Sequence, residues 1–246
     1  MKTLILNTKN EFYKLISKKK YFVILIIAVI ICIGRLGGSI LISALSEGNI
    51  AIKSNMLLEM MPFCAEIVVP LLVFMAVTDL FSSEVQEDTM KADLLRPVSR
   101  FKVLTSKAIA SFLIGAVCFA VFFITCLILQ LISKTPFDAL SSFAAYAIDL
   151  VPIFALVFLA IVINLISKSP SLAMLLCIGI YALFKYLNYF VSPLGQLVFT
   201  AYAQWHKLWL GELLPFNAMI SKIGILFGSI LILYTVSYIM FDKKDF

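Results

Sequence analysis

The sequence has little charge and few of the residues that break helices. Only 14% of its 246 residues are charged, and histidine occurs once, as His206. Glycine and proline are also scarce, with 10 and 8 residues. An ordinary soluble domain has about 25% charged residues, so this composition excludes one. The scarcity of Gly and Pro leaves long hydrophobic segments without interruption.

Several catalytic and binding motifs are absent. The pattern GxxxxGK[ST], whose backbone amides hold nucleotide phosphates, does not occur, so we expect no ATP site of the Walker type in this chain. HExxH and GxSxG are also missing, which removes the zinc ligands of a metalloprotease and the nucleophile turn of a serine hydrolase. We therefore expect no catalytic residues and no metal site. His206, beside Trp205, is expected to be an interfacial aromatic side chain.

The five cysteines indicate buried thiols. All lie within hydrophobic segments, and no two form a CxxC pair. An odd number in such positions argues against a disulfide framework and against a zinc site. The cysteines are Cys32, Cys64, Cys118, Cys126 and Cys177.

What the chain does contain is hydrophobic sequence. Hydrophobic residues make up 62% of it and the mean hydropathy is +1.05, values typical of a multi-pass membrane protein. A helix needs roughly 20 apolar residues to cross the hydrocarbon core of a bilayer. Six segments qualify, so we predict an all-α membrane protein with six transmembrane helices. The segments are approximately 21–45, 62–82, 107–132, 143–167, 171–190 and 222–241. The first has no small-residue cleavage site and is expected to remain as a span.

Two stretches outside the spans have their own patterns. Residues 1–20 are predicted to form an amphipathic helix in the membrane interface, preceding a transmembrane domain of residues 21–246. Residues 191–221, between spans five and six, are interrupted by Pro, Gly and polar residues. Their apolar part is too short to cross, so we predict an outer re-entrant or interfacial hairpin. Trp205 and Trp209 would share one face of it at headgroup level.

The distribution of basic residues predicts the orientation. Of the 20 Lys and Arg residues, 14 lie in the N-terminal segment, in residues 84–107, in the loop at Lys168 and at the C-terminus. All of these segments would be on one side of a six-span protein. Because loops rich in Lys and Arg stay in the cytoplasm, we expect both termini to be cytoplasmic in a multi-pass protein of the cell membrane. The net charge of +6 reflects this bias, and no nucleic-acid partner is expected.

Residues 84–107 form the one long charged stretch, between the second and third spans. The part from Glu84 to Asp93 can continue the second span as a helix. Pro97 then ends that helix, because its ring removes a donor and clashes with the preceding turn. Ser99 can cap a new helix that leads into the third span. The result is a short, angled helical element with exposed charges, which could transmit movement to both spans; an ordinary solvated loop is the alternative.

This stretch resembles the signature of ABC-2-type transporter permeases. The family pattern reads E…GT…LLxxPVSR…K. The matching residues are Glu84, Thr89, Leu94, Leu95, Arg96, Pro97, Val98, Ser99, Arg100 and Lys107. Asp88 is a departure, since the family usually has Gly before the Thr. The number of spans and the basic N-terminal segment agree with the same family.

The resemblance implies the membrane subunit of an ABC exporter with the type V exporter fold. In that family two permeases pair, here as an expected homodimer with a heterodimer left open. Each contacts a separate ATPase subunit that binds ATP and magnesium, so no cofactor is expected in this chain. Residues 84–107 would contain the coupling helix, residues 1–20 the elbow helix, and residues 191–221 the re-entrant hairpin. The coupling residues implied are Glu84, Glu87, Asp88, Arg96, Pro97, Ser99 and Arg100.

Charged residues also occur inside the predicted spans. Arg35, Glu66 and Asp149 fall at similar estimated depths, roughly 6–9 Å from the outer edge at 1.5 Å per residue. We expect Arg35 to pair with Glu66 or Asp149. This cluster would be either a structural ion pair or an outer gate for the substrate. Asp79, near the cytoplasmic end of the second span, is expected to face water.

These observations favour a non-catalytic permease subunit of an ATP-driven exporter. The few polar residues in the spans exclude a large hydrophilic substrate and favour hydrophobic or amphipathic peptides, including antimicrobial peptides, or antibiotics. One alternative is efflux of sodium or another small ion, with Glu66, Asp79 and Asp149 as oxygen ligands. Another is a peptide-binding immunity or sensor protein without transport. A membrane-embedded enzyme is disfavoured by the missing motifs.

Overall fold

The structure is a computed structural model that describes residues 2–45, 55–94, 98–133, 136–190, 198–202, 204–210 and 215–244. These residues form helices and turns, with no strand among them. Six helical segments are long and apolar enough to cross a membrane, which confirms the predicted six-span, all-α fold. The segments lie in α2 (Lys19–Leu45), Met56–Gln86, α7 (Arg100–Ser133), Ala139–Ile166, α10 (Pro170–Phe190) and α12 (Phe216–Lys243).

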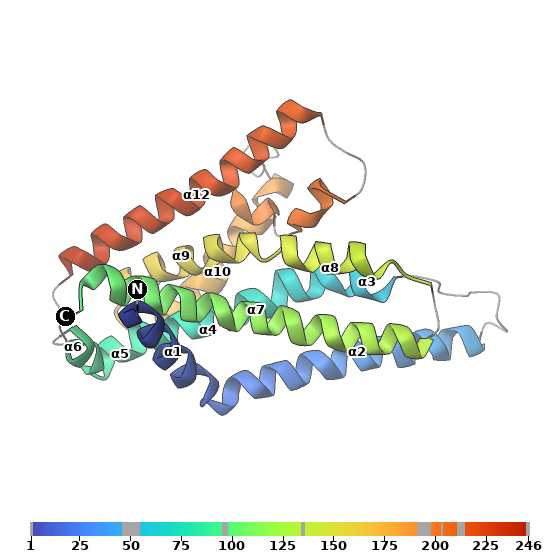
Figure 1. Ribbon diagram of the computed structural model, residues 1–246, viewed down its shortest axis with the longest axis horizontal. Helices are drawn as coiled ribbons and strands as arrows, with labels where there is room; N and C mark the ends of the chain where they lie inside the picture. Colours follow the sequence, from blue (N-terminus) through green and yellow to red (C-terminus); the bar gives the residue numbers. More distant parts are fainter. Residues whose placement is uncertain are drawn as a thin grey trace.

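The spans run along the long axis of the molecule, and both termini lie at the same end (Figure 1). This end, called the terminal end below, also carries the short helices α5 (Ser82–Gln86) and α6 (Thr89–Leu94). The second and fourth spans are the most buried, whereas α2, α10 and α12 are exposed along most of their length. Helices that are apolar on all sides and exposed in this way suit contact with lipid or with another membrane helix.

The N-terminal segment forms a separate helix, α1 (Lys2–Ile16), joined to α2 by a turn at Ser17 and Lys18. It lies at an angle to α2 and packs mainly against α7 (Figure 1). Leu15 is fully buried in this contact, and Phe12 packs beside it. The helix is as predicted, although it ends at residue 16; its place in a membrane interface stays a prediction.

The second span changes helix type along its length. It consists of α3 (Met56–Phe63), a π-helical turn η1 (Cys64–Val68), α4 (Val69–Leu80) and then α5. Pro70 explains part of the change, because it has no N–H to donate to the carbonyl of Glu66 four residues earlier. The hydroxyl of Tyr181 on α10 donates to that carbonyl instead, at 3.0 Å. Turns of π-helix are often found at functional sites.

The fourth span is also broken, into α8 (Ala139–Ile148) and α9 (Val151–Ile166). Asp138 caps α8 by accepting from the amide of Leu140 at 3.1 Å. Asp149 lies at the break, and Pro152 is accommodated in the first turn of α9. Between the spans, Gly115 of α7 lets three helices pack closely. A Cβ there would lie 3.1 Å from Ile153 of α9 and 3.2 Å from Val73 of α4.

Helix boundaries differ from the predicted span boundaries. All six spans begin earlier than expected, and the four that begin at residues 56, 100, 139 and 216 do so by four or more residues, because each helix continues beyond its hydrophobic segment. The predicted hairpin of residues 191–221 lies partly outside the described residues. Its described part forms two 3₁₀ turns, η2 (Phe199–Tyr202) and η3 (Trp205–Leu208). Trp205 is buried and Trp209 is exposed, so the two do not share a face; the α-helical spacing on which that expectation depended is absent.

Candidate functional site

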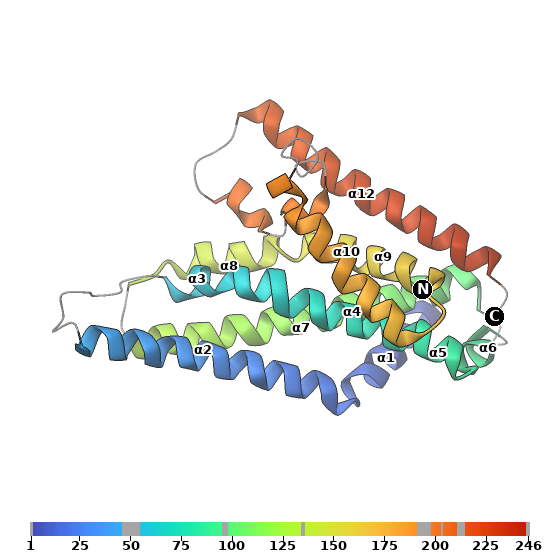
Figure 2. The ribbon, with the colours of Figure 1, turned by 180° about the vertical axis from the view of Figure 1, so that it is seen from behind.

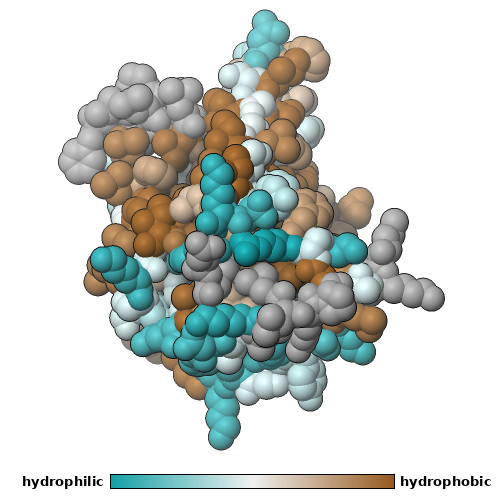
Figure 3. Space-filling view, turned by 90° about the vertical axis from the view of Figure 1, so that its left-hand side faces the viewer, coloured by the Kyte–Doolittle hydropathy of each residue, from teal (hydrophilic) through white to brown (hydrophobic). Residues whose placement is uncertain are grey.

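Hydrophilic side chains gather at the terminal end of the molecule (Figure 3). The second span turns there at Phe81 and continues through α5 and α6. In Figures 1 and 2 these two helices lie at the same end of the molecule as both termini. They contain the described part of the predicted coupling segment.

A buried charge network connects this segment to the rest of the protein. Lys107 of α7 is fully buried, and its Nζ lies 2.5 Å from Oε2 of Glu84 on α5. The same Nζ is 3.3 Å from Oε2 of Glu11 on α1. Lys14, also on α1, lies 3.3 Å from both carboxylates. These four residues, called the charge network below, join α1, the predicted coupling segment and the third span.

The charge network brings together the first and last residues of the family signature. Glu84 and Lys107 are 23 positions apart in the sequence but form the shortest contact of the network. A buried charge is tolerated only with well-placed partners, since removing one partner leaves the other charge desolvated. The placement of Glu84 corrects the expectation that its charge is exposed, because the residue is only 7% exposed.

Asp79 on α4 forms a second buried cluster at the same end. Its carboxylate is 2.6 Å from Nζ of Lys20 and 3.3 Å from Nζ of Lys18, and it accepts a hydrogen bond from the hydroxyl of Tyr21 at 2.7 Å. Asp79 was expected to face water, but it is buried against the start of the first span. The turn between α1 and α2 supplies the lysines, so the first and second spans are joined beside the charge network.

The surface of the coupling segment is a short turn between α5 and α6. Its exposed residues are Gln86, Glu87, Asp88, Thr89 and Lys91, called the exposed turn below. Met90 points inward and is buried, which anchors the turn. Thr89 donates from its hydroxyl to the carbonyl of Glu84 at 3.3 Å, linking the turn to the charge network.

Asp88 has a left-handed backbone, with φ of 56°. Glycine adopts this conformation without steric cost, and aspartate tolerates it better than most residues. The family pattern has Gly at this position, and Asp88 makes the same turn. Its carboxylate pairs with Lys91 at 2.8 Å on the surface.

Arg100 is half-buried, and its guanidinium contacts the C-terminal segment of the same chain. Its guanidinium donates to the carbonyls of Phe241, Asp242 and Lys244 at 3.4, 2.5 and 3.1 Å, and so caps the C-terminal end of α12. Beside it, Lys244 donates to the carbonyl of Leu165 at 2.6 Å, and partial burial lowers the pKa of this lysine. These contacts attach the sixth span to the start of the third.

The remaining predicted coupling residues have different positions. Ser99 is exposed and directly precedes α7, where its carbonyl accepts from the amides of Lys102 and Val103 at 2.9 and 3.2 Å. This is the position expected of a helix cap. Arg96 and Pro97 lie outside the described residues. Of the seven predicted coupling residues, Glu87, Asp88 and Ser99 are therefore on the surface in the described part of the chain.

Over residues 7–219, the sequence matches the model of a family described as ABC-2 family transporter protein. The chain belongs to the ABC-2 transporter family. No curated protein matches it. The match covers five of the six spans and the start of the last, as well as the whole coupling segment. This ABC-2 protein is therefore a membrane transporter permease, in a family that generally works with an ABC ATPase in a lipid bilayer.

At the opposite end of the ABC-2 permease, the predicted charge cluster does not form. Arg35 pairs with Glu59, Glu66 with Lys185, and Asp149 with His206 at 2.8 Å. The depth estimate failed because the second span begins at residue 56 rather than 62. This places Glu59 within the span and puts Glu66 about 15 Å along it. Asp149 turns toward η3, where it also accepts from the amide of His206 at 2.6 Å.

His206 is buried and its ring lies against Asp149, while its depth in the membrane stays a prediction. The five cysteines are buried as predicted. Those of α2 and α7 meet, with Sγ atoms of Cys32 and Cys126 3.9 Å apart.

Sequence reasoning missed three members of the charge network in this ABC-2 permease. Glu11 and Lys14 belonged to the amphipathic N-terminal segment, and Lys107 was matched to the family signature without a predicted partner. One signal could have found them: a charged residue on the apolar side of a helix requires a partner of opposite charge. Glu11, one position before Phe12 and four before the buried Leu15, is such a residue.

Proposed function

We propose that this chain is the permease subunit of an ATP-driven ABC exporter, on which a separate ATPase subunit docks at the exposed turn. The observation that carries the proposal is the charge network. It connects the exposed, charged turn to α1 and to the third span. A turn that only connected two spans would not need a fully buried lysine beneath it.

Movement of the exposed turn would reach several spans at once. Glu84 passes it to α7 through Lys107 and to α1 through Lys14. Phe81, at the start of α5, packs edge-on against Phe241 of α12 with ring centroids 6.1 Å apart. Through these contacts the coupling segment, α1 and the ends of the third and sixth spans would move together when an ATPase subunit shifts the turn.

The proposed orientation follows from the distribution of the basic residues and from the need for a cytoplasmic ATPase. The terminal end carries the exposed turn and most of the Lys and Arg residues outside the spans, so it faces the cytoplasm. ATP and magnesium are bound there by the partner ATPase, and this chain is a non-catalytic subunit. Two copies of the permease with two ATPase subunits complete the transporter. The exposed faces of α2, α10 and α12 leave room for the second copy.

The proposed cargo is a hydrophobic or amphipathic peptide or antibiotic. Sodium efflux is supported less well by the structure. Among the described residues no three His, Cys, Asp or Glu side chains gather in a way that could hold a metal ion. Glu66, Asp79 and Asp149 are in separate places, and each is already paired with a basic group.

The test is purification of the tagged full chain from membranes of its own host, with identification of co-purifying proteins. We expect an ATP-binding ABC subunit. Reversing the charges of the exposed turn, with Glu87→Lys, Asp88→Lys and Lys91→Glu together, should abolish this association while the permease still inserts. Lys168→Glu is the matched control, because Lys168 is exposed in the neighbouring loop.

The possible results separate the parts of the proposal. Absence of an ATPase from the wild-type preparation would overturn the exporter function and favour the immunity or sensor alternative. Association that survives the triple reversal would retain the exporter but remove the exposed turn as the docking site.

A further inference from the structure

A groove lies between the second span and α10, beside Glu66. It has a volume of about 430 Å³ and its walls come from η1, α4 and α10, which lie side by side (Figure 2). The apolar wall includes Ile67, Leu71, Phe74 and Ile178. Glu66 and Lys185 form an ion pair at its edge, and neither side chain is fully buried. Charged side chains this far inside a span are costly, and those that occur there often mark a functional site.

The backbone is arranged to direct Glu66 into this groove. Glu66 is the middle residue of the π-helical turn, in which one extra residue rotates the side chain relative to a regular α-helix. Pro70 and the hydroxyl of Tyr181 stabilise that turn, as described above. The irregularity in the span is therefore centred on the carboxylate.

Gln204 adds a second polar group to the same place. Its Nε2 donates to Oε1 of Glu66 at 2.8 Å. Its own Oε1 is buried and has no hydrogen-bond partner among the described residues. The groove thus offers the carboxylate of Glu66, whose two oxygens are acceptors, to a ligand with N–H donors. Lys185 provides its one cation, on a flexible stem that can swing away.

We propose that this groove binds the ammonium or guanidinium head of a cationic amphiphile, which displaces Lys185 from Glu66 while its apolar body lies along the groove. The site names the substrate class of the proposed exporter and rests on that function for its role in transport. Lys185 occupies the site when no ligand is present, so the carboxylate is never left unpaired. An anionic head is disfavoured, since it would approach two acceptors.

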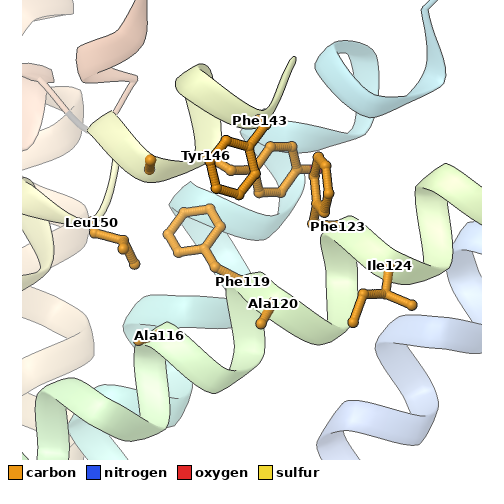
Figure 4. A pocket seen from close by; sticks show the side chains of 9 residues that line it. Ala116, Phe119, Ala120, Phe123, Ile124, Phe143, Tyr146 and Leu150 are labelled. Atoms are coloured by element: carbon orange, nitrogen blue, oxygen red, sulfur yellow. The ribbon is translucent and has the colours of Figure 1, made fainter. Parts of the chain in front are cut away.

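A second pocket lacks the charged group that such a site needs. About 330 Å³ of space lies between α7 and α8, where the rings of Phe119, Phe123, Phe143 and Tyr146 gather (Figure 4). No charged side chain lines it. The hydroxyl of Tyr146 already donates to the carbonyl of Leu57 at 3.0 Å. This pocket offers nothing to a charged head, whereas the groove at Glu66 has both parts.

The test uses the full chain in phosphatidylcholine nanodiscs without an ATPase. The probe is 1,12-diaminododecane dansylated at one end, whose free amine is cationic, compared with its neutral form acetylated at that amine. Glu66→Gln should bind the amine about tenfold more weakly, the factor for one lost hydrogen bond to a charged group. Lys185→Met should bind it more tightly, because the internal competitor is gone. Glu59→Gln, which removes the carboxylate of the separate Arg35 pair, is the matched control and should leave binding unchanged.

The opposite signs of the two variants distinguish a binding site from a structural ion pair. Equal weakening in Glu66→Gln and Lys185→Met would make the pair structural and overturn the proposal. So would equal binding of the amine and its acetylated form. Should Glu66→Gln fail to fold, Lys185→Met alone decides, since weaker or unchanged binding contradicts competition. None of these results depends on an ATPase, so a negative result here leaves the co-purification test of the exporter untouched.

Discussion

Lys107 is a fully buried lysine whose charge is balanced by the carboxylates of Glu84 and Glu11. Replacing it with Met would keep most of its volume but leave two buried carboxylates with Lys14 as their remaining partner in the network. We expect Lys107→Met to destabilise the permease by about 3–5 kcal/mol. The measurement is the melting temperature of the detergent-solubilised chain, followed by size-exclusion chromatography after heating.

A second substitution tests the reason for that loss. Adding Glu84→Gln to Lys107→Met removes one orphaned charge and should restore part of the melting temperature. Lys168→Met, at an exposed position, should change nothing. If the double variant is no more stable than Lys107→Met alone, then packing rather than charge explains the effect.

Substitutions of Asp88 test whether the turn needs a left-handed backbone at this position. Its φ of 56° should favour Gly and oppose a β-branched residue. Asp88→Gly is expected to be neutral or slightly stabilising, and Asp88→Val to destabilise by about 1–2 kcal/mol. Both remove the exposed pair with Lys91, which is worth at most about 1 kcal/mol, so each variant controls for the other. Equal thermal stability of the two would show that the turn does not need the left-handed conformation.

At the scale of elements, the spans pack closely where one of them has no side chain. Gly115 of α7 faces Ile153 of α9 and Val73 of α4, the two nearest groups to a Cβ placed there. Both nearest atoms are Cγ2 methyls of β-branched residues, which are stiff at χ1, so Gly115→Ala should already require a shift of a few tenths of an ångström. Gly115→Leu should force α7 away from both helices. We expect it to destabilise the protein by more than the about 1–3 kcal/mol typical of overpacking, and so to reduce the yield of folded protein.

Gly179 of α10 is the matched control, because nothing lies within 4 Å of a Cβ placed there. Gly179→Leu should leave the yield of monodisperse protein near that of the wild type. A similar yield for both leucine variants would mean that the contact of α7 with α4 and α9 is not tight.

Several tertiary contacts join the ends of the spans rather than their faces. Arg100 begins α7 and caps α12, and Asp79 on α4 holds the lysines that begin α2. Each contact therefore joins the end of one span to the end of another. Among the described residues toward the opposite end, Arg35 pairs with Glu59.

At the scale of the whole molecule, orientation in the membrane is the property to test. A cysteine in place of Ser99, exposed at the terminal end, should be labelled only from the cytoplasmic side of intact cells. A cysteine in place of Ser141, near the start of α8, should be labelled from outside. Impermeant maleimide is the reagent, and the five buried native cysteines should give little background. Labelling of the Ser99 variant from outside would invert the orientation and exclude docking of a cytoplasmic ATPase at the exposed turn.

The number and approximate position of the spans could be predicted from the sequence, because crossing a bilayer requires a fixed length of apolar residues whatever surrounds them. The same holds for the separate helix over residues 2–16 and for the burial of the cysteines. The family could be identified as well, since the motif ending in Pro97, Val98, Ser99 and Arg100 is a local pattern. These properties depend on residues that are neighbours in the chain.

Tertiary structure alone decided which charges meet. Glu84 lies 23 positions from Lys107 and Glu66 119 positions from Lys185, distances over which no local pattern carries information. Arg35 pairs with Glu59 rather than Glu66. The second span begins six residues earlier than its hydrophobicity indicates, which places Glu59 within the span. A buried charge requires a partner but not a particular one, and helix packing chooses among the candidates. The sequence therefore determined that this is a six-span ABC-2 permease, and the fold determined which partners its buried charges have.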